Sequence, residues 1–223
     1  MNDKLRLHIL DDLNQLSRKA ADIFVSEYQS STNHFFIVPG GQTPKIFFKI
    51  ILNEINEWNN AKFILSDERL TENKDHLNSV MLEKIFKNKG PRLLKFIQNN
   101  QNQKIISEIK NIVPQIAILG LGEDSHTASL FPGDPKIFND TNKIILYTKK
   151  QNEDFYRVSL TFNYLMKAKR IVFIVSGSNK AKALKNCLHS NYDHNLYPAQ
   201  FIFKNYNNRI DIVCDQDSAN LIT

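Results

Sequence analysis

One histidine, flanked by carboxylates in a glycine-containing stretch, is the best candidate for proton transfer in this sequence. His126 follows Glu123 and Asp124 within the segment Gly120–Gly133. Imidazole is the usual side chain for moving a proton near neutral pH. Asp124, two residues earlier, is positioned to orient the ring or to balance its charge. A purely structural loop histidine is the alternative interpretation.

Charged side chains also follow an apolar run directly. Asp67, Glu68 and Arg69 come after the run 61–65. A guanidinium fork suits a phosphate or a carboxylate, and a structural ion pair is the alternative. Arg157 opens an alternating segment that predicts a further strand, where an exposed arginine at a sheet edge would be equally ordinary.

Two turns could bind an anion. Gly40, Gly41 and Thr43 lead into a predicted helix, whose N-terminal N–H groups and partial positive charge attract a phosphate. Lys180 stands at the start of another predicted helix, where the helix dipole disfavours a cation unless a bound anion faces it. Ordinary tight turns and a solvated lysine are the alternatives.

The cysteines and histidines form no metal-ligand pattern. Cys187 and Cys214 lack zinc spacing, and His126 has no second histidine near it. We therefore expect two free structural thiols in a reducing cytoplasm, no metal and no cofactor.

Four apolar runs must position these groups. Most are nearly continuous and rich in Ile, Val and Phe, as in strands buried on both faces of a parallel sheet. They are residues 34–38, 61–65, 115–119 and 170–175. Segments with helical spacing lie between them, so the pattern predicts an α/β fold: a three-layer αβα sandwich with a mainly parallel, Rossmann-like sheet.

Each run ends in one of the polar or glycine-containing turns. In open α/β sheets, ligands bind outside the carboxyl ends of the strands. Four turns of this chemistry at that edge therefore predict one shared site.

Length and composition fit this prediction. The chain has 223 residues, 42% hydrophobic and 23% charged, which excludes disordered, collagen-like and disulfide-scaffold classes. We expect a single domain over residues 1–223, with no secretory signal and no membrane span, in the cytoplasm.

The formal net charge of +6 requires an explanation. Its lysines are scattered along the sequence without interleaved aromatics or a nucleic-acid-binding motif, so we expect neither nucleic acid nor membrane as a partner. A small anionic substrate remains, recognised by Arg69, Arg157 and Lys180. The sequence does not indicate whether the protein is a monomer or a homodimer.

In their order, these motifs resemble the 6-phosphogluconolactonases of the glucosamine-6-phosphate isomerase/6-phosphogluconolactonase family. The resemblance extends from about Leu13 to Gln200, and Thr127–Gly133 is its most specific part. It implies the sugar-phosphate isomerase/lactonase type of fold and cofactor-free hydrolysis of 6-phospho-D-glucono-1,5-lactone to 6-phosphogluconate in the oxidative pentose phosphate pathway.

The resemblance also implies roles for the residues already singled out. His126 would be the general base acting on water, supported by Asp124, and Asp67 is the third catalytic candidate. The implied substrate and phosphate ligands are Gly40, Gly41, Thr43, Arg69, Arg157 and Lys180.

Glucosamine-6-phosphate deaminases are the nearest alternative, because they share the fold and the phosphate turns. They typically carry an Ile-Ala-Phe-Asn-Glu-Pro segment after the histidine and a tyrosine at the position of Arg69, and this chain has neither. Their proton-transfer base matches Asp67, so Asp67 does not decide between the two. A non-catalytic sugar-phosphate-binding relative is a further alternative.

This chain departs from the lactonase pattern at two places. Ser125 replaces the usual glycine before the histidine, and Glu153–Tyr156 replaces prolines often found before the arginine. If position 125 requires a positive φ, we expect the serine to be strained there.

Overall fold

The computed structural model describes residues 4–87, 89–97, 102–139 and 142–223, and its core is a seven-stranded sheet in which every neighbouring pair is parallel. The predicted layered α/β fold with a mainly parallel sheet is confirmed. In spatial order the strands are β1 (Leu5–Leu10), β10 (Arg209–Asp215), β9 (Arg170–Val175), β6 (Ile116–Gly120), β2 (Phe35–Val38), β3 (Lys62–Leu65) and β5 (Arg92–Leu94).

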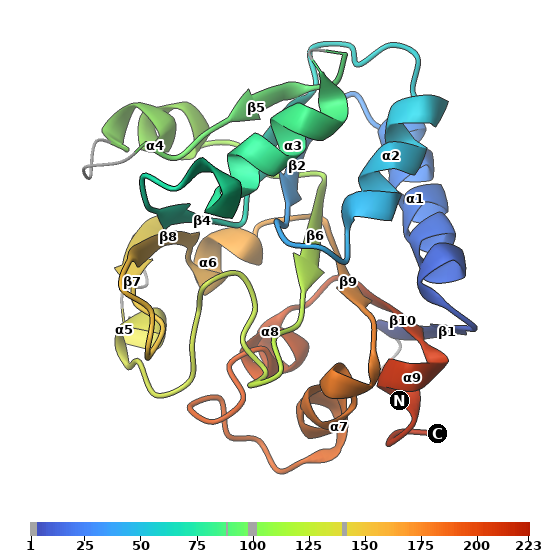
Figure 1. Ribbon diagram of the computed structural model, residues 1–223, viewed down its shortest axis with the longest axis vertical. Coiled ribbons are helices and arrows are strands. Elements are labelled where there is room, and N and C mark those ends of the chain that lie inside the picture. Colours follow the sequence, from blue (N-terminus) through green and yellow to red (C-terminus); the bar gives the residue numbers. More distant parts are fainter. Residues whose placement is uncertain (1–3, 88, 98–101, 140–141) are drawn as a thin grey trace.

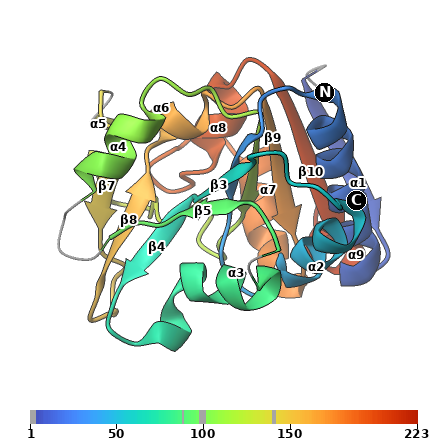
Figure 2. The same ribbon diagram turned by 90° about the horizontal axis from the view of Figure 1, so that it is seen from above.

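Helices cover both faces of this sheet (Figures 1 and 2). α1 (Leu13–Ser30) and α2 (Lys45–Glu54) lie on one face, and α6 (Phe162–Leu165), α7 (Ala181–His189) and α8 (Gln200–Asn205) lie on the other. The remaining helices are η1 (Lys74–His76), α3 (Asn78–Phe86), α4 (Gln103–Ile109), α5 (Lys136–Asn139), η2 (Ser178–Lys180) and α9 (Gln216–Ala219). Within the described residues, no helix is both long and apolar enough to cross a membrane.

The first helix forms where the sequence signals it. The side chain of Asp12 caps α1 by accepting a hydrogen bond from the backbone N–H of Gln15 at 2.8 Å. Leu16, Ala20 and Phe24 then fall on one side of the helix and are fully buried against the sheet. Elsewhere in the core both cysteines are buried and free, and burial raises the pKa of each thiol to about 12.

A smaller antiparallel sheet stands beside the large one. It consists of β4 (Asp67–Leu70), β8 (Tyr156–Leu160) and β7 (Ile145–Thr148). Ser66 joins the two sheets: its N–H donates to the Val38 carbonyl at 2.8 Å, and its own carbonyl accepts from Leu160 N–H at 2.8 Å. The chain therefore leaves the large sheet at the carboxyl end of β3 and carries Asp67 to the junction.

β10, one of several strands that the sequence patterns do not predict, contains a buried carboxylate. Asp211 is fully buried, and its oxygens bond to Arg170 at 2.8 Å, Arg209 at 2.9 Å and His8 at 2.8 Å. Burial alone would raise the pKa of Asp211, but these three partners outweigh it and lower the pKa to about 2. The cluster links β1, β10 and β9.

Replacing this carboxylate should destabilise the fold. We expect Asp211→Asn to lower the free energy of unfolding by about 3 kcal/mol, because two arginines lose their buried counter-charge. Since the folded pKa of Asp211 is depressed, its contribution is complete above about pH 4 and is lost as the pH falls towards 2. Urea unfolding of both proteins between pH 7 and pH 2.5 measures this.

Asp217→Asn is the control, since Asp217 is exposed in the helix that directly follows β10. It should change the unfolding free energy by less than about 0.5 kcal/mol. Equal stability of wild type and Asp211→Asn at pH 7 would contradict the stabilising role of the cluster.

Candidate active site

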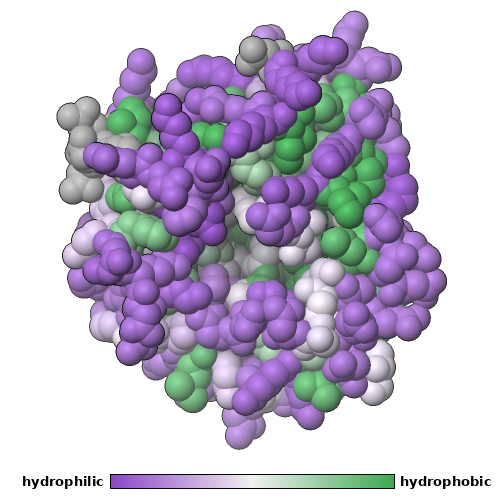
Figure 3. All heavy atoms as spheres, in the orientation of Figure 1, coloured by the Kyte–Doolittle hydropathy of each residue, from purple (hydrophilic) through white to green (hydrophobic). Residues whose placement is uncertain are grey.

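A cavity of about 280 Å³ opens at the carboxyl ends of β2, β3, β6 and β9, four strands that are adjacent in the sheet. The space-filling view is hollowed near its centre, where this cavity reaches the surface (Figure 3). All four turns singled out in the sequence contribute to its wall. The expected site residues that line it are Gly40, Gly41, Thr43, Asp67, Arg69, His126, Arg157 and Lys180.

Asp124, the remaining expected residue, stands behind His126 rather than in the wall. An oxygen of its carboxylate contacts Nδ1 of His126 and also accepts from the His126 backbone N–H at 3.2 Å. Burial would raise the pKa of Asp124, but the bond from His126 outweighs it, and the pKa falls to about 2. The carboxylate is therefore ionised and accepts only, so Nδ1 carries the proton and Nε2 is left to accept another.

Gly122 makes room for this pair. Its N–H donates to the His126 carbonyl at 2.8 Å, which closes the loop around the histidine. A Cβ at this position would lie 2.1 Å from Nδ1 of His126, so no larger residue fits without displacing the ring. The ring itself packs against Phe131, with centroids 4.7 Å apart.

The backbone of this loop is left-handed at two residues other than glycine. Ser125 has φ of +65° and Ala128 has φ of +52°. Ser125 therefore occupies the conformation that favours the glycine usual at this position, as the sequence comparison with lactonases led us to expect. Its side chain is buried, with Oγ at 3.5 Å from the Ala183 carbonyl, so the serine is accommodated at a conformational cost.

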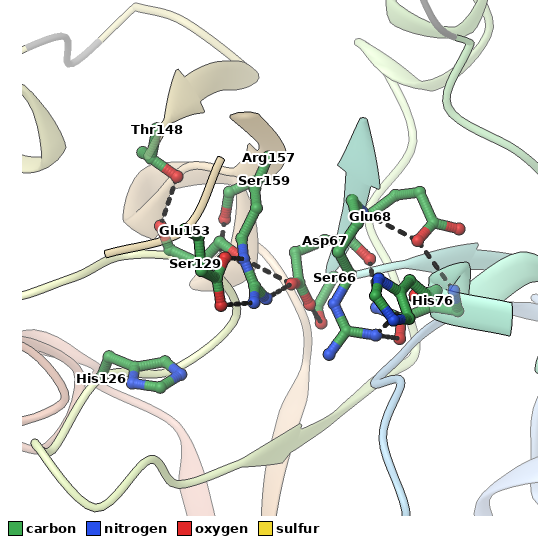
Figure 4. Close-up of polar contacts among 12 residues, drawn as sticks. Ser66, Asp67, Glu68, His76, His126, Ser129, Thr148, Glu153, Arg157 and Ser159 are labelled. Atoms are coloured by element: carbon green, nitrogen blue, oxygen red, sulfur yellow. Dashed lines mark hydrogen bonds and ion pairs between the residues drawn. The ribbon is translucent and has the colours of Figure 1, made fainter. Parts of the chain in front are cut away.

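Asp67 lies in a buried polar cluster on the opposite wall (Figure 4). It accepts from Ser129 Oγ at 2.5 Å and from Ser66 Oγ at 3.0 Å, and one of its oxygens is 3.8 Å from Arg157 Nη1. Asp67 is only 7% exposed. These contacts join β4 and β8 to the loop that carries His126.

Arg157 is held by an acid whose role the sequence does not reveal. Glu153 accepts from Arg157 Nε at 2.8 Å and from Nη2 at 2.6 Å, a two-point clamp. The guanidinium also lies 5.6 Å from the ring centres of Phe131 and Phe155. Burial of Glu153 would raise its pKa, but the bond from Arg157 outweighs it and lowers the pKa. The spacing of four residues between acid and arginine is the only signal in the sequence.

Arg69 is tethered to the segment that leads into α3. Its Nη1 donates to the His76 carbonyl and to Asn78 Oδ1, each at 2.8 Å. Gly40 leaves the space that the Asn78 side chain fills, because a Cβ on Gly40 would lie 1.9 Å from it. This glycine is therefore required for packing, a role that the sequence alone does not indicate.

Glu68 holds the start of α3 against β4. Its buried carboxylate accepts from the backbone N–H groups of Arg69 and Asn78 at 2.8 Å and of Ser79 at 2.7 Å. Burial raises the pKa of Glu68, although these bonds oppose the shift.

Lys180 approaches the cavity from the turn after β9. Its Nζ is 4.0 Å from an oxygen of Glu123, and the lysine side chain is 22% exposed. Asp215 anchors the turn by accepting from Gly177 N–H at 3.0 Å and from Ser176 Oγ at 2.5 Å. Within the described residues, no group of three or more His, Cys, Asp or Glu side chains is arranged to hold a metal ion.

Known proteins share both the sequence pattern and this fold. Residues 11–211 match the family of glucosamine-6-phosphate isomerases/6-phosphogluconolactonase. The 6-phosphogluconolactonase of Haemophilus influenzae is 30% identical over 206 residues, which span 82% of this chain and 87% of that protein.

Two solved structures have the same fold as this chain. The 6-phosphogluconolactonase from Trypanosoma brucei superposes with a TM-score of 0.84 at 18% identity, covering 99% of both chains. A monomeric glucosamine-6-phosphate deaminase gives 0.81 at 15% identity, covering 97% of this chain and 99% of that one. The fold therefore does not separate the lactonase branch from the deaminase branch, and the distinction must come from individual residues.

The strain at Ser125 can be measured by comparing two substitutions. Ser125→Gly removes the left-handed penalty, whereas Ser125→Ala keeps it and removes the same hydroxyl. We expect the glycine variant to be more stable than the alanine variant by about 1 kcal/mol. Urea unfolding at pH 7 measures the difference, and an alanine variant as stable as the glycine variant would show that position 125 is unstrained.

Proposed function

The chain belongs to the glucosamine-6-phosphate isomerase/6-phosphogluconolactonase family, and we propose that it hydrolyses 6-phospho-D-glucono-1,5-lactone to 6-phosphogluconate in the oxidative pentose phosphate pathway. The proteins of Aggregatibacter actinomycetemcomitans and Haemophilus influenzae that it matches carry the name of this enzyme. One structural observation carries the proposal: Asp124 and His126 form an oriented proton acceptor at a cavity whose wall also presents Arg157 and Lys180.

The reaction needs a base for water rather than a covalent nucleophile, because a lactone is an activated ester. Nε2 of His126 accepts a proton from a water molecule as the water oxygen attacks C1 of the lactone. Asp124, bonded to Nδ1, stabilises the imidazolium that forms. The C1–O bond of the ring then breaks, and His126 returns the proton to the departing ring oxygen.

The tetrahedral intermediate places a negative charge on the former carbonyl oxygen, which requires hydrogen-bond donors. Gly122 does not qualify, since its N–H already donates to the His126 carbonyl. In the described structure the N–H groups of Gly40 and Gly41 donate to no protein group, and both residues line the cavity. These two N–H groups, together with Arg69, are the proposed oxyanion donors.

The phosphate would bind away from the reacting carbonyl, to Thr43, Arg157 and Lys180. Binding there fixes the sugar so that C1 faces His126, and the remote contact contributes orientation to the chemical step. Glu153 partly neutralises Arg157, so an incoming phosphate competes with that carboxylate for the guanidinium.

Asp67 is assigned a positioning role in this mechanism. Both of its oxygens already accept hydrogen bonds from serine hydroxyls, Ser66 on one and Ser129 on the other. The deaminase alternative would instead use this carboxylate as a base at carbon 2 of the sugar. The bonds to Ser66 and Ser129 favour the lactonase, because they occupy both oxygens of Asp67 and hold the carboxylate in the buried cluster.

The His126 substitution tests the mechanism. We expect His126→Ala to lower kcat by roughly 10²–10⁴-fold with a smaller change in KM, since general-base catalysis is lost while the phosphate contacts remain. The assay follows hydrolysis of freshly generated lactone above its spontaneous rate. His189→Ala, an exposed histidine of α7, is the control and should retain wild-type rates.

Two results would overturn this function. Wild-type kcat in His126→Ala would remove the histidine from the mechanism. Failure of the folded wild-type protein to exceed the spontaneous rate would reject the lactonase, and ammonia release from glucosamine 6-phosphate would then identify a deaminase.

Glu153 sets the affinity for the phosphate in this scheme. Glu153→Gln removes the competing charge, while the rings of Phe131 and Phe155 still hold the guanidinium. We expect KM to fall about fivefold, equivalent to about 1 kcal/mol, with kcat nearly unchanged. Asp154→Asn removes an exposed neighbouring charge and should leave KM unchanged. A higher KM in Glu153→Gln would instead mean that the clamp mainly positions Arg157.

A further inference from the structure

A second depression, of about 600 Å³, adjoins the candidate active site between α2 and α3, which lie side by side (Figure 1). Gly41, Gln42, Arg69 and Asn78 line both cavities. A ligand in this groove, hereafter the α2–α3 groove, would therefore lie at the mouth of the cavity that holds His126.

The α2–α3 groove concentrates positive charge. One carboxylate, Asp75, is present among the residues that line it. The cationic lining residues are Lys45, Lys49, Arg69, Lys74, Lys84 and Lys87. This local excess of five nearly equals the formal net charge of +6 of the whole chain. The fold therefore gathers around one groove several lysines that are scattered in the sequence.

Most of these lysines are not neutralised by the protein. Lys84 pairs with Asp75 at 3.3 Å. Lys49, Lys74 and Lys87 are exposed, and within the described part of the chain they form no ion pair. Their charges are therefore available to a ligand.

The positions of two groove lysines are unfavourable for the stability of α2. Lys45 and Lys49 occupy the first two turns of α2, near the positive end of the helix dipole, and their spacing of i and i+4 places them on one side of the helix. No acidic residue stands in the first turn to compensate. The fold thus keeps an uncompensated repulsion beside the active-site cavity, which an anionic ligand would relieve.

We propose that the α2–α3 groove is a capture site for phosphorylated sugars, which bind there weakly before they enter the catalytic cavity. This inference rests on the proposed lactonase function, whose substrate carries a phosphate dianion. A concave surface lined by one sign of charge raises the local concentration of an oppositely charged substrate and its rate of association. The shared lining residues provide a direct route from the groove to the cavity.

The test changes the position of charge while holding its total constant. The groove variant carries Lys49→Gln, Lys74→Gln and Lys87→Gln. The distal variant carries Lys110→Gln, Lys169→Gln and Lys204→Gln; these exposed lysines precede β6, β9 and β10 and so lie towards the opposite end of the sheet. Both variants lower the formal net charge from +6 to +3. A third variant replaces the same three groove lysines with arginine and keeps the charge.

In the groove variant we expect kcat/KM for the lactone to fall roughly tenfold at low ionic strength, with kcat unchanged. In the distal variant it should fall less than about twofold, and the arginine variant should retain the wild-type value. The difference should vanish in 1 M salt, where the screening length is about 3 Å. Thermal unfolding confirms that each variant is folded before the rates are compared.

Equal losses in the groove and distal variants would overturn the proposal, because they would show a general effect of net charge. A salt dependence as steep in the groove variant as in wild type would overturn it as well. These failures are distinct from failure of the lactonase function, which would already appear as the absence of wild-type acceleration before any variant is compared.

Discussion

The candidate site depends on the backbone of one residue, Ser66, which bonds to both sheets. Its N–H pairs with β2 of the parallel sheet, and its carbonyl pairs with β8 of the antiparallel one. The chain is thereby turned out of the large sheet at the point where β3 ends, and it brings Asp67 and Arg69 across from His126. Without this departure the four turns would stand in a single row along the sheet edge, and the cavity would have one wall instead of two.

The cations of this region fall into two groups with different physical roles. Arg157 is clamped by Glu153, Arg69 is tethered to Asn78, and Lys180 faces Glu123. Because these side chains are already ordered, less entropy is lost when a phosphate binds. The acidic partners Glu153 and Glu123, however, neutralise part of the positive charge of Arg157 and Lys180. Among the residues that the structure describes, Lys49, Lys74 and Lys87 form no ion pair. They supply long-range attraction without defined geometry, as expected of residues that collect a ligand rather than orient it.

The sequence predicts the parts of this architecture that local patterns specify. The four apolar runs correspond to β2, β3, β6 and β9 with ends that agree within one residue, and these strands are adjacent in the sheet. β10 escapes detection because Asp211 interrupts its apolar pattern. The tertiary contacts of Asp211 with Arg170, Arg209 and His8 make that carboxylate tolerable in a buried strand. The clamp between Glu153 and Arg157 depends on how a turn brings the acid back to β8, which spacing alone does not determine.

The distribution of positive charge is the feature that the order of residues in the sequence predicts least well. Lys49, Lys74 and Lys87 are far enough apart along the chain to look like a solvated background, and no window of the sequence contains them as a cluster. Packing of α2 against α3 converts this dispersed set into one groove, while the acids that would offset it are used elsewhere. Glu68 is buried beneath the start of α3, and Glu83 pairs with Lys95 on the far side of that helix from the groove lining. A net charge of +6 is therefore compatible with either an even or a clustered distribution of cations, and in this fold six of the cations line one groove together with a single carboxylate.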